Sequence, residues 1–439
     1  MKCTRTEFDG YTEELYEPDD PPAAASKGNG RDPDPWPVLD HAAYHGLAGE
    51  IIAVLSPQTE SDPIALLLQF LVSFGNAIGR KPFYLVEADR HYTNLFALLV
   101  GRSSKSRKGV SAGRIRSIFE IADRNWANRC TLGGMSSGEG IIWAVRDPIF
   151  GMKRGEEEII DPGIEDKRLL LDVREFFQPL AVLKREGNIL SRIVRDAWDC
   201  RNCLTSITKH SPARATDALI SIIGHITADE LQQTLDHTSM ANGYANRFLF
   251  ACVRRGKILP HGGYSDEKET ARLGRVTLEA LEAARRLDRV MMREDAYRFW
   301  EEIYPKLSED RPGLLGAITA RAEAQTIRLA LLYALLDLSP EIARVHLEAA
   351  LALWRYCDAS AHYIFGDLVG DPVADTILRA LRTVHPAGMS RSDISGLFRN
   401  HLAAGKIGAA LERLHAAKKV RFEMQQPTIG RPREMWFIV

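Results

Sequence analysis

The chain has 439 residues, of which 45% are hydrophobic and 26% charged, and its formal net charge is −1. This composition excludes a wholly disordered protein, and the balanced charge excludes a nucleic-acid binder that is basic over its entire surface. At this length we expect two or three domains. The six cysteines form no disulfide framework, and the apolar runs are shorter than a membrane span. We therefore expect a cytoplasmic protein with no membrane segment.

The first half of the chain changes from a polar leader to alternating strands and helices. Residues 1–35 are rich in Pro, Asp, Glu and Gly, which predicts a disordered leader. Residues 36–90 form a helical segment by their apolar spacing, with a short strand at 83–88. The run at 95–100 is continuously apolar and ends at Gly101, which is typical of a strand buried on both faces of a parallel sheet. A helical pattern with apolar residues from 115 to 126 follows.

The later apolar runs extend the same pattern. Runs at 168–172, 219–224 and 248–253 alternate with helical stretches, so residues 91–263 are predicted to be an α/β domain with a mostly parallel sheet covered by helices. Residues 264–370 have a wholly helical pattern. A break at Gly370, Asp371 and Pro372 separates them from a compact segment at 371–439.

The loop after the first buried strand has the order of a phosphate-binding loop: strand, glycine, lysine, hydroxyl, helix. Its spacing is irregular, because Lys108 follows Gly101 by seven residues and a glycine follows the lysine. Lys105 is an alternative to Lys108, and a basic surface turn is an alternative to a nucleotide site. The residues predicted to contact ATP are Gly101, Ser104, Lys105, Ser106, Arg107, Lys108, Gly109 and Ser111, with Ser111 also predicted to hold Mg²⁺.

Acidic residues follow the next two predicted strands. ATP hydrolysis needs one carboxylate that orients water and another that holds Mg²⁺. Glu139, in a glycine-flanked turn, is the predicted general base, and Asp172, at the end of an apolar run, is the predicted Mg²⁺ ligand. Glu175 is a candidate for either role. Each of these carboxylates taken alone is also compatible with an ordinary surface position.

Polar residues near the last two strands supply further candidates. His225 and Thr227 follow a buried run and are predicted to sense the γ-phosphate, although Thr227 also fits a helix N-cap. Arg247 is predicted to enter a neighbouring subunit's site, with Arg254 or Arg255 as alternatives and an ordinary ion pair as the competing explanation. The lone Cys200–Cys203 pair lacks the further ligands that zinc requires.

The C-terminal segment at 371–439 is predicted to contain three helices followed by a β-hairpin, the order of a winged helix-turn-helix. It holds 11 Lys and Arg residues against 6 Asp and Glu residues, so its local charge is +5. Phosphate contacts from such cations would give salt-dependent DNA affinity, and a protein-interaction module is the alternative. The predicted DNA contacts are Lys406, Arg413, Lys418, Lys419, Arg431 and Arg433.

Several stretches, among them HYTNLFALLVGRSSKSRKGVS, SSGEGIIWAVRDP and IIGHITADEL, resemble a family of uncharacterised RecA-like P-loop ATPases of phages, plasmids and integrative elements. The resemblance covers most of residues 36–340 and implies a RecA-like core, a homo-oligomer such as a hexamer, and ATP with Mg²⁺ at subunit interfaces. Primase or other replication proteins are implied as partners. By this resemblance, Lys108 and Ser111 fit the phosphate loop, and Arg247 fits the arginine that acts on the neighbouring subunit.

Two departures from the family pattern leave the function open. The phosphate loop is stretched, and Val173 follows Asp172 where many P-loop enzymes have glutamate. The first hypothesis is a DNA-dependent ATPase, helicase-like, that acts in the replication of a mobile element. The second is a non-catalytic initiator or regulator that binds nucleotide and DNA. A third is an assembly ATPase with a protein partner.

Overall fold

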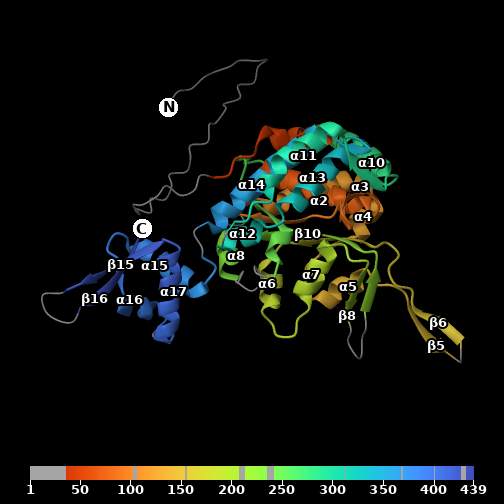
Figure 1. Ribbon diagram of the computed structural model, residues 1–439. Coiled ribbons are helices and arrows are strands. Elements are labelled where there is room, and N and C mark those ends of the chain that lie inside the picture. The colour runs from red at the N-terminus through yellow and green to blue at the C-terminus, as the bar shows by residue number, and fades with distance from the viewer. Residues whose placement is uncertain are drawn as a thin grey trace, which may run out of the picture.

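The centre of the structure is a five-stranded sheet in which every pair of neighbouring strands is parallel (Figure 1). The strand order is β11-β3-β10-β7-β4. The predicted mostly parallel sheet is thereby confirmed, because each of the buried apolar runs forms one of its strands. These strands are β3 (Phe96–Val100), β4 (Thr131–Gly133), β7 (Arg168–Val173), β10 (Leu219–Ile226) and β11 (Phe248–Cys252).

This computed structural model describes residues 36–101, 106–153, 156–206, 213–234, 242–311, 313–366, 369–399, 401–426 and 432–439. The predicted disordered leader at 1–35 lies outside the described residues. So do Ser104 and Lys105 of the phosphate loop and Arg431 of the C-terminal segment.

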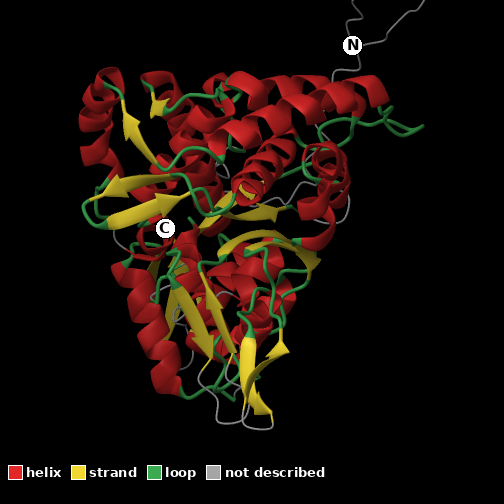
Figure 2. Cartoon of the chain, turned by 90° about the vertical axis from the view of Figure 1, so that its right-hand side faces the viewer, coloured by secondary structure: helices red, strands yellow, loops and turns green. Residues whose placement is uncertain are grey.

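Helices cover both faces of the central sheet, as Figure 2 shows from the side. Side chains alternate along each strand, so Ile223 of β10 points into one hydrophobic core while Ile222 points into the other. The first core contains residues of α2 (Pro63–Ile78), α3 (Lys108–Ala122), α10 (Glu267–Ala284), α13 (Ala322–Leu336) and α14 (Arg344–Phe365). The second contains residues of α5 (Gly138–Ala144), α6 (Phe177–Leu183), α7 (Leu190–Trp198) and α8 (Ala228–Thr234).

The first core joins three segments that the sequence divides at 90/91 and 263/264. Residues from 43 to 357 contribute to it, so the N-terminal helices, the sheet and the later helices pack as neighbours. The chain also contains shorter elements, most of them at the edges of this body. They are η1 (His41–Ala43), α1 (Gly46–Leu55), η2 (Ser56–Gln58), α4 (Arg124–Arg129), η4 (Ala245–Arg247), α11 (Glu294–Leu307), α12 (Gly313–Thr319), and the hairpins β5 (Ile149–Lys153) with β6 (Glu156–Asp161) and β8 (Cys203–Ser206) with β9 (Ala213–Thr216).

A second, four-stranded sheet contains two strands that the helical pattern at 264–370 conceals. Its order is β13-β12-β1-β2, with β1 (Phe83–Val86), β2 (Asp89–Tyr92), β12 (Arg289–Met292) and β13 (Glu341–Ile342). The prediction of a wholly helical segment is therefore wrong at β12 and β13. Both are only two to four residues long and are held by backbone pairing with a distant segment, which a local pattern does not reveal.

The C-terminal segment has its own hydrophobic core, and Figure 1 shows it beside the main body. The predicted order of three helices and a hairpin is confirmed: α15 (Pro372–Val384), α16 (Arg391–Leu397), α17 (Ala404–Ala416), β15 (Val420–Gln425) and β16 (Arg433–Ile438). A short strand β14 (Met389–Ser390) adds a third member to its sheet. The predicted cap is also present, because Ser390 and Asp393 form a capping box at α16. No helix in the described part of the chain is long and apolar enough to cross a membrane.

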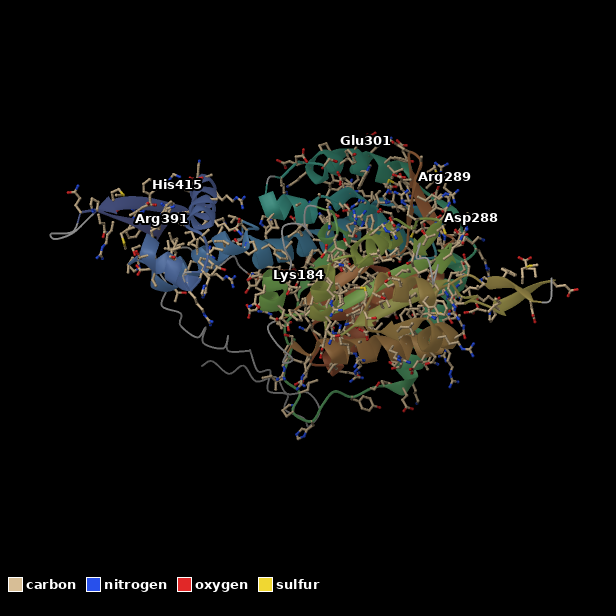
Figure 3. The ribbon with its side chains drawn as sticks, turned by 90° about the horizontal axis from the view of Figure 1, so that it is seen from below. Lys184, Asp288, Arg289, Glu301, Arg391 and His415 are labelled. Atoms are coloured by element: carbon tan, nitrogen blue, oxygen red, sulfur yellow. The ribbon has the colours of Figure 1, made fainter. Side chains whose placement is uncertain are left out.

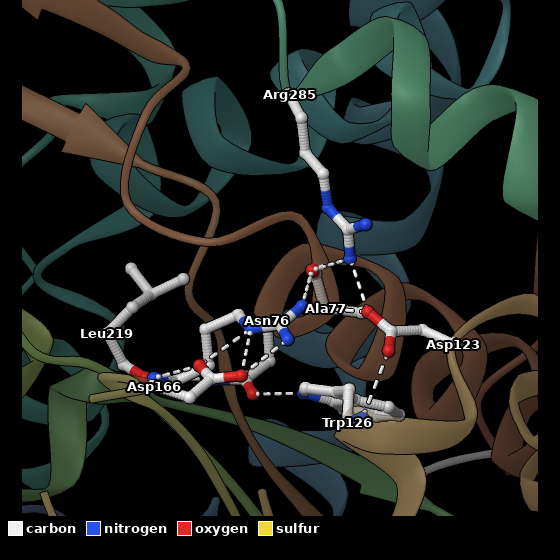
Figure 4. A network of polar contacts seen from close by, with 8 residues as sticks. Asn76, Ala77, Asp123, Trp126, Asp166, Leu219 and Arg285 are labelled. Atoms are coloured by element: carbon white, nitrogen blue, oxygen red, sulfur yellow. Dashed lines mark hydrogen bonds and ion pairs between the residues drawn. The ribbon is translucent and has the colours of Figure 1, made fainter. Parts of the chain in front are cut away.

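One buried amide ties α2 to the beginning of the central strands (Figure 4). The Asn76 side chain is fully buried, and its Nδ2 donates to the carbonyl oxygens of Leu169 (3.0 Å) and Leu219 (3.1 Å). Its Oδ1 accepts a hydrogen bond from Trp126 Nε1 at 2.8 Å. Asn76 therefore connects α2 with β7, β10 and α4 through one set of hydrogen bonds.

Replacing Asn76 by Leu should lower the free energy of unfolding by about 3 kcal/mol, because it leaves several buried polar groups without partners. Replacing Trp126 by Phe removes only one of these bonds and should cost about 1 kcal/mol. Chemical unfolding followed by tryptophan fluorescence and circular dichroism measures both values. Equal decreases in the two variants would contradict a central role for the amide.

Candidate nucleotide site at the carboxyl edge of the sheet

The loop after β3 begins at a glycine held against the neighbouring strand. The Gly101 amide donates to the Ile226 carbonyl oxygen at 3.1 Å, at the end of β10. A Cβ atom at Gly101 would lie 2.5 Å from Ser106 Oγ, so a larger residue would not fit there. Arg107 has a left-handed backbone (φ 54°), and Lys108 is the first residue of α3. The predicted order of strand, glycine and helix is confirmed, while residues 102–105 of the loop lie outside the described residues.

Lys108 places a cation at the N-terminus of a 15-residue helix. Its Nζ donates to the Ile226 carbonyl oxygen at 2.9 Å. Burial lowers the pKa of Lys108, while the nearby Glu230 carboxylate acts in the opposite direction. The ammonium and the free N–H groups of the helix end both attract anions, so phosphate is a suitable ligand for this position.

Asp172 and His225 lie on adjacent strands and point to the face covered by α3. Asp172 is paired in register with Ile223, and alternation places His225 one pleat further along the same face. Within the described structure, Asp172 Oδ1 and His225 Nε2 are buried without hydrogen-bond partners. Asp172 Oδ2 lies 3.5 Å from Arg174 Nε. Buried polar atoms without partners are uncommon in native proteins, and two of those in the described structure lie at the carboxyl ends of adjacent strands.

The charges of these groups act on one another. Burial lowers the pKa of His225 to about 4, so the imidazole is neutral at pH 7. Asp172 opposes this shift, and Lys108 and Arg174 add to it. Residues of α2, α3 and β7 line a small cavity, and Asp172 and Arg174 form part of its wall. Lys108, Asp172 and His225 thus form one electrostatic cluster, which we call the edge cluster.

The edge cluster lies between two adjacent strands, β3 and β10, that are followed by helices on opposite faces of the sheet. β3 leads to α3 on one face, whereas β10 leads to α8 on the other. Ligands of open parallel sheets bind in the crevice formed at such a point. Thr227 caps α8 by accepting from the Glu230 amide at 3.2 Å, and the Glu230 carboxylate accepts from the Thr227 amide at 3.0 Å. The N-cap prediction for Thr227 is confirmed.

Glu139 and Glu175 lie at the same edge of the sheet and are exposed. Glu139 is in the first turn of α5, which Ser137 caps, and α5 packs on the face opposite to α3. Glu175 follows β7, and its Oε2 accepts from Gln178 Nε2 at 2.9 Å. The predicted strand-tip position of Glu139 differs from the structure, which places it in α5, six residues after the end of β4, while Glu175 lies two residues after β7. Within the described residues, however, no hydrogen bond or ion pair joins either carboxylate to the edge cluster.

Ser111 does not lie where a Mg²⁺ ligand is needed. Its side chain is fully buried, and its Oγ donates to the Lys108 carbonyl oxygen at 2.7 Å and accepts from Gln69 Nε2. Three residues after Lys108, the hydroxyl points toward α2 rather than toward the loop. The prediction of Ser111 as a metal ligand is contradicted by this geometry.

Arg247 is a structural residue at the opposite edge. It precedes β11, so it lies at the amino edge of the parallel sheet. Its side chain is 6% exposed, and Nη2 lies 2.7 Å from Asp199 Oδ2. The guanidinium also lies over the Trp198 ring, 5.6 Å from its centroid. A buried, paired arginine at this edge is unable to enter a neighbouring subunit's site, and that prediction is wrong.

Arg255, an alternative to Arg247, follows β11 and so lies at the carboxyl edge of the sheet. It forms an ion pair with Glu60, which also pairs with Arg107 of the phosphate loop. Arg107 Nε lies 2.6 Å from Glu60 Oε2, and Arg255 Nη1 lies 3.8 Å from Glu60 Oε1. A hydrogen bond from the Leu259 amide, together with both arginines, lowers the pKa of Glu60. Arg254 instead donates its amide to Asp62 Oδ2 at 2.8 Å. No motif in the sequence points to Glu60, which lies about 40 residues before the loop.

A second polar group, His45, Asp337 and His346, has the composition of a metal site. Both Nε2 atoms point to Asp337 Oδ2, at 2.6 Å from His45 and 3.2 Å from His346. However, His346 Nδ1 accepts a hydrogen bond from the Ala343 amide, so the proton of the neutral ring is on Nε2. That tautomer donates to Asp337 and does not coordinate a metal. We therefore assign this group to hydrogen bonding between α1, α13 and α14.

The basic residues of the C-terminal segment are divided between exposed and engaged positions. Lys406, at the start of α17, and Lys418, just after it, are exposed. Arg413 instead forms an ion pair with Asp371, and Lys419 Nζ donates to the Gly366 carbonyl oxygen at 2.8 Å. Arg433 is exposed at the start of β16. Arg413 thus joins α17 to the N-cap of α15 within the segment, and Lys419 holds the segment to the end of α14.

Comparison of the chain with protein-family models and with curated proteins found no match. The family resemblance of the sequence stays a prediction. The assignment of a function to the edge cluster consequently depends on its geometry and charge.

The lowered pKa of His225 predicts a pH dependence of stability. The unfolded histidine titrates near 6.5 and the folded one near 4, so between these values the unfolded chain binds more protons. The contribution of neutral His225 to the free energy of unfolding is fully present above pH 6.5. It is lost as the pH falls toward 4, and the loss is at most about 3 kcal/mol. His225→Gln should flatten the unfolding free energy against pH in this window. The exposed His261→Gln variant is the control, and parallel curves for both variants would contradict the assignment.

Proposed function

We propose that the chain binds the triphosphate of ATP at the carboxyl edge between β3 and β10 and hydrolyses it. The observation that carries this proposal is the edge cluster: a partly desolvated Lys108 at a helix N-terminus beside the unpartnered Asp172 Oδ1 and His225 Nε2. A cation and a helix end favour phosphate, and a buried carboxylate oxygen favours a divalent metal ion.

Each residue then has a role that follows from its chemistry. Lys108 leaves the Ile226 carbonyl oxygen and binds the terminal phosphates. Asp172 would hold Mg²⁺, which when bound neutralises charge that develops on the phosphate oxygens. His225 is neutral and can donate or accept one hydrogen bond at the γ-phosphate. Glu139 is the proposed base that orients water, with Glu175 as the alternative.

The arrangement of the sheet supports a RecA-like core. The acid-bearing β7 and the loop-bearing β3 flank β10, so their carboxyl ends meet at one edge. Together with the resemblance of the sequence, this favours a homo-oligomer with ATP and Mg²⁺ at its subunit interfaces. Since Arg247 is buried at the other edge, an arginine acting across the interface has to come from elsewhere, and Arg255 is a candidate on this chain.

The C-terminal segment supports an action on DNA. Its three helices and three-stranded sheet have the order of a winged helix, and Lys406 and Lys418 are exposed around α17. We therefore propose a DNA-associated, helicase-like ATPase in the cytoplasm that acts in the replication of a mobile genetic element, with primase or other replication proteins as partners.

A second candidate function is nucleotide binding without turnover. It is favoured by Ser111, whose hydroxyl is engaged by α2, and by Gly109, which stands next to Lys108 where a hydroxyl residue would assist Mg²⁺ binding. In that case the chain is a DNA-binding initiator or regulator that uses ATP as a structural ligand.

Lys108→Ala should reduce ATP hydrolysis by on the order of 100-fold, because it removes the main positive charge from the transferred phosphate. Asp172→Asn should reduce hydrolysis to a similar extent while nucleotide affinity without metal changes little. Lys268→Ala is the matched control, since Lys268 is an exposed lysine in the first turn of α10. The measurements are phosphate release and binding of a fluorescent ATP analogue.

The outcomes separate the two functions. Tight ATP binding that needs Lys108, without phosphate release in the presence or absence of single-stranded DNA, would favour the non-catalytic function. ATP binding or hydrolysis unchanged in Lys108→Ala would reject the site itself.

Exchanging Lys406 and Lys418 for Glu should weaken DNA binding, because each of these side chains would neutralise one phosphate of the DNA backbone. Each such neutralisation contributes about 1 to the slope of log affinity against log salt, so the slope should fall by about 2 in magnitude. Fluorescence anisotropy with the full chain at several salt concentrations measures it. Exchange of the exposed Lys268 and Lys306 is the control, and equal slopes in all three proteins would contradict DNA binding by α17.

A further inference from the structure

The hairpin of β5 and β6 extends away from the body (Figures 1 and 3), and several of its apolar side chains are exposed. Phe150 is paired with Ile159, and Met152 with Glu157, so these four side chains share one face of the ribbon. Phe150 is 54% exposed, Met152 73% and Ile159 56%. The described part of the chain therefore leaves this face open to solvent.

An isolated hairpin with such a face is not expected to be stable in water. Two-stranded ribbons are marginal unless they pack on another surface. At its base, Arg146 forms a bidentate ion pair with Asp161, with Nε to Oδ2 at 2.7 Å and Nη2 to Oδ1 at 3.0 Å. This pair fixes the direction of the hairpin but leaves its outer half without support. Contiguous exposed apolar side chains of this kind usually mark a protein interface.

The same chain carries a groove that suits this face. It lies between the β4–α5 loop and α6, and its apolar lining includes Leu132, Phe177 and Val182. Leu132 is 41% exposed and Phe177 43% exposed, so the groove is open. Gly133 and Gly134 form part of its wall, where a partner backbone can approach closely.

The one charged residue in the groove lining is basic, whereas β6 of the hairpin carries acids. Glu156, Glu157 and Glu158 lie along β6 of the hairpin. Lys184 and Arg185 follow α6, and Arg185 lines the groove. In Figure 3 the hairpin projects from one side of the body and Lys184 lies on the other side, so the two surfaces do not meet within one chain.

We propose that the β5–β6 hairpin of one copy docks into the groove between the β4–α5 loop and α6 of a second copy. Because the two surfaces differ, the contact is head-to-tail, and repeating it gives a closed ring or a filament rather than a twofold dimer. The proposal depends on surface shape and charge and does not require nucleotide, so it is independent of the ATPase proposal.

Sedimentation velocity of the full chain without nucleotide tests this assembly. The wild-type chain is expected to form oligomers larger than a dimer as its concentration rises through the micromolar range. The double variant Phe150→Ser with Met152→Ser should sediment as a monomer at the same concentrations. Phe422→Ser with Met424→Ser is the matched control, because these residues are similarly exposed on β15 of the C-terminal hairpin and should leave the assembly unchanged.

Two further variants identify the partner surface. Glu157→Lys should weaken the assembly, and adding Arg185→Glu should restore it. Mixing a Met152→Cys chain with a Gln178→Cys chain should give a disulfide-linked pair that neither chain forms alone. A wild-type chain that stays monomeric, an oligomer that survives the Phe150 and Met152 exchange, or linkage of hairpin to hairpin would overturn the proposal. ATP hydrolysis by a strictly monomeric chain would overturn this interface and the placement of ATP between subunits, and would leave the proposed ATP site at the edge cluster intact.

Discussion

The carbonyl oxygen of Ile226 holds the candidate site together. It accepts hydrogen bonds from the Gly101 amide and from Lys108 Nζ, so both ends of the phosphate loop are fixed to the tip of β10. The position of β10 depends in turn on its pairing with β3 and β7. A ligand that attracts Lys108 therefore competes with one carbonyl oxygen for the ammonium group.

Polar side chains on the strands of this sheet are energetically unfavourable unless they have hydrogen-bond partners. Both faces of its strands are buried, so a polar side chain on them is costly unless it finds a partner. Asp172 and His225 occur where the strands end, with one buried atom each left without a partner among the described residues. A group of this kind costs about 1–3 kcal/mol. A ligand that forms hydrogen bonds with both atoms would remove these two costs.

Much of this architecture could be predicted from the sequence because it is local. Continuous apolar runs predict buried parallel strands, and the order of Gly101, Lys108 and Asp172 along the chain places them at one edge. Strands β12 and β13 could not be predicted, because they are defined by pairing with distant residues. Glu60 was missed for the same reason: it reaches Arg107 and Arg255 only after the chain has folded.

The two incorrect site assignments have a common cause, which is the direction of a side chain relative to the sheet. Ser111 is close to Lys108 in sequence, but helical geometry turns it toward α2. Arg247 precedes its strand, whereas Lys108 and Asp172 follow theirs, and in a parallel sheet this difference alone places them at opposite edges. At the amino edge, Arg247 is balanced by Asp199, and Arg328 by the oxygens of Asn94 and Trp198. At the carboxyl edge Arg107 and Arg255 are paired with Glu60, whereas the hydrogen bond of Lys108 Nζ is to a carbonyl oxygen.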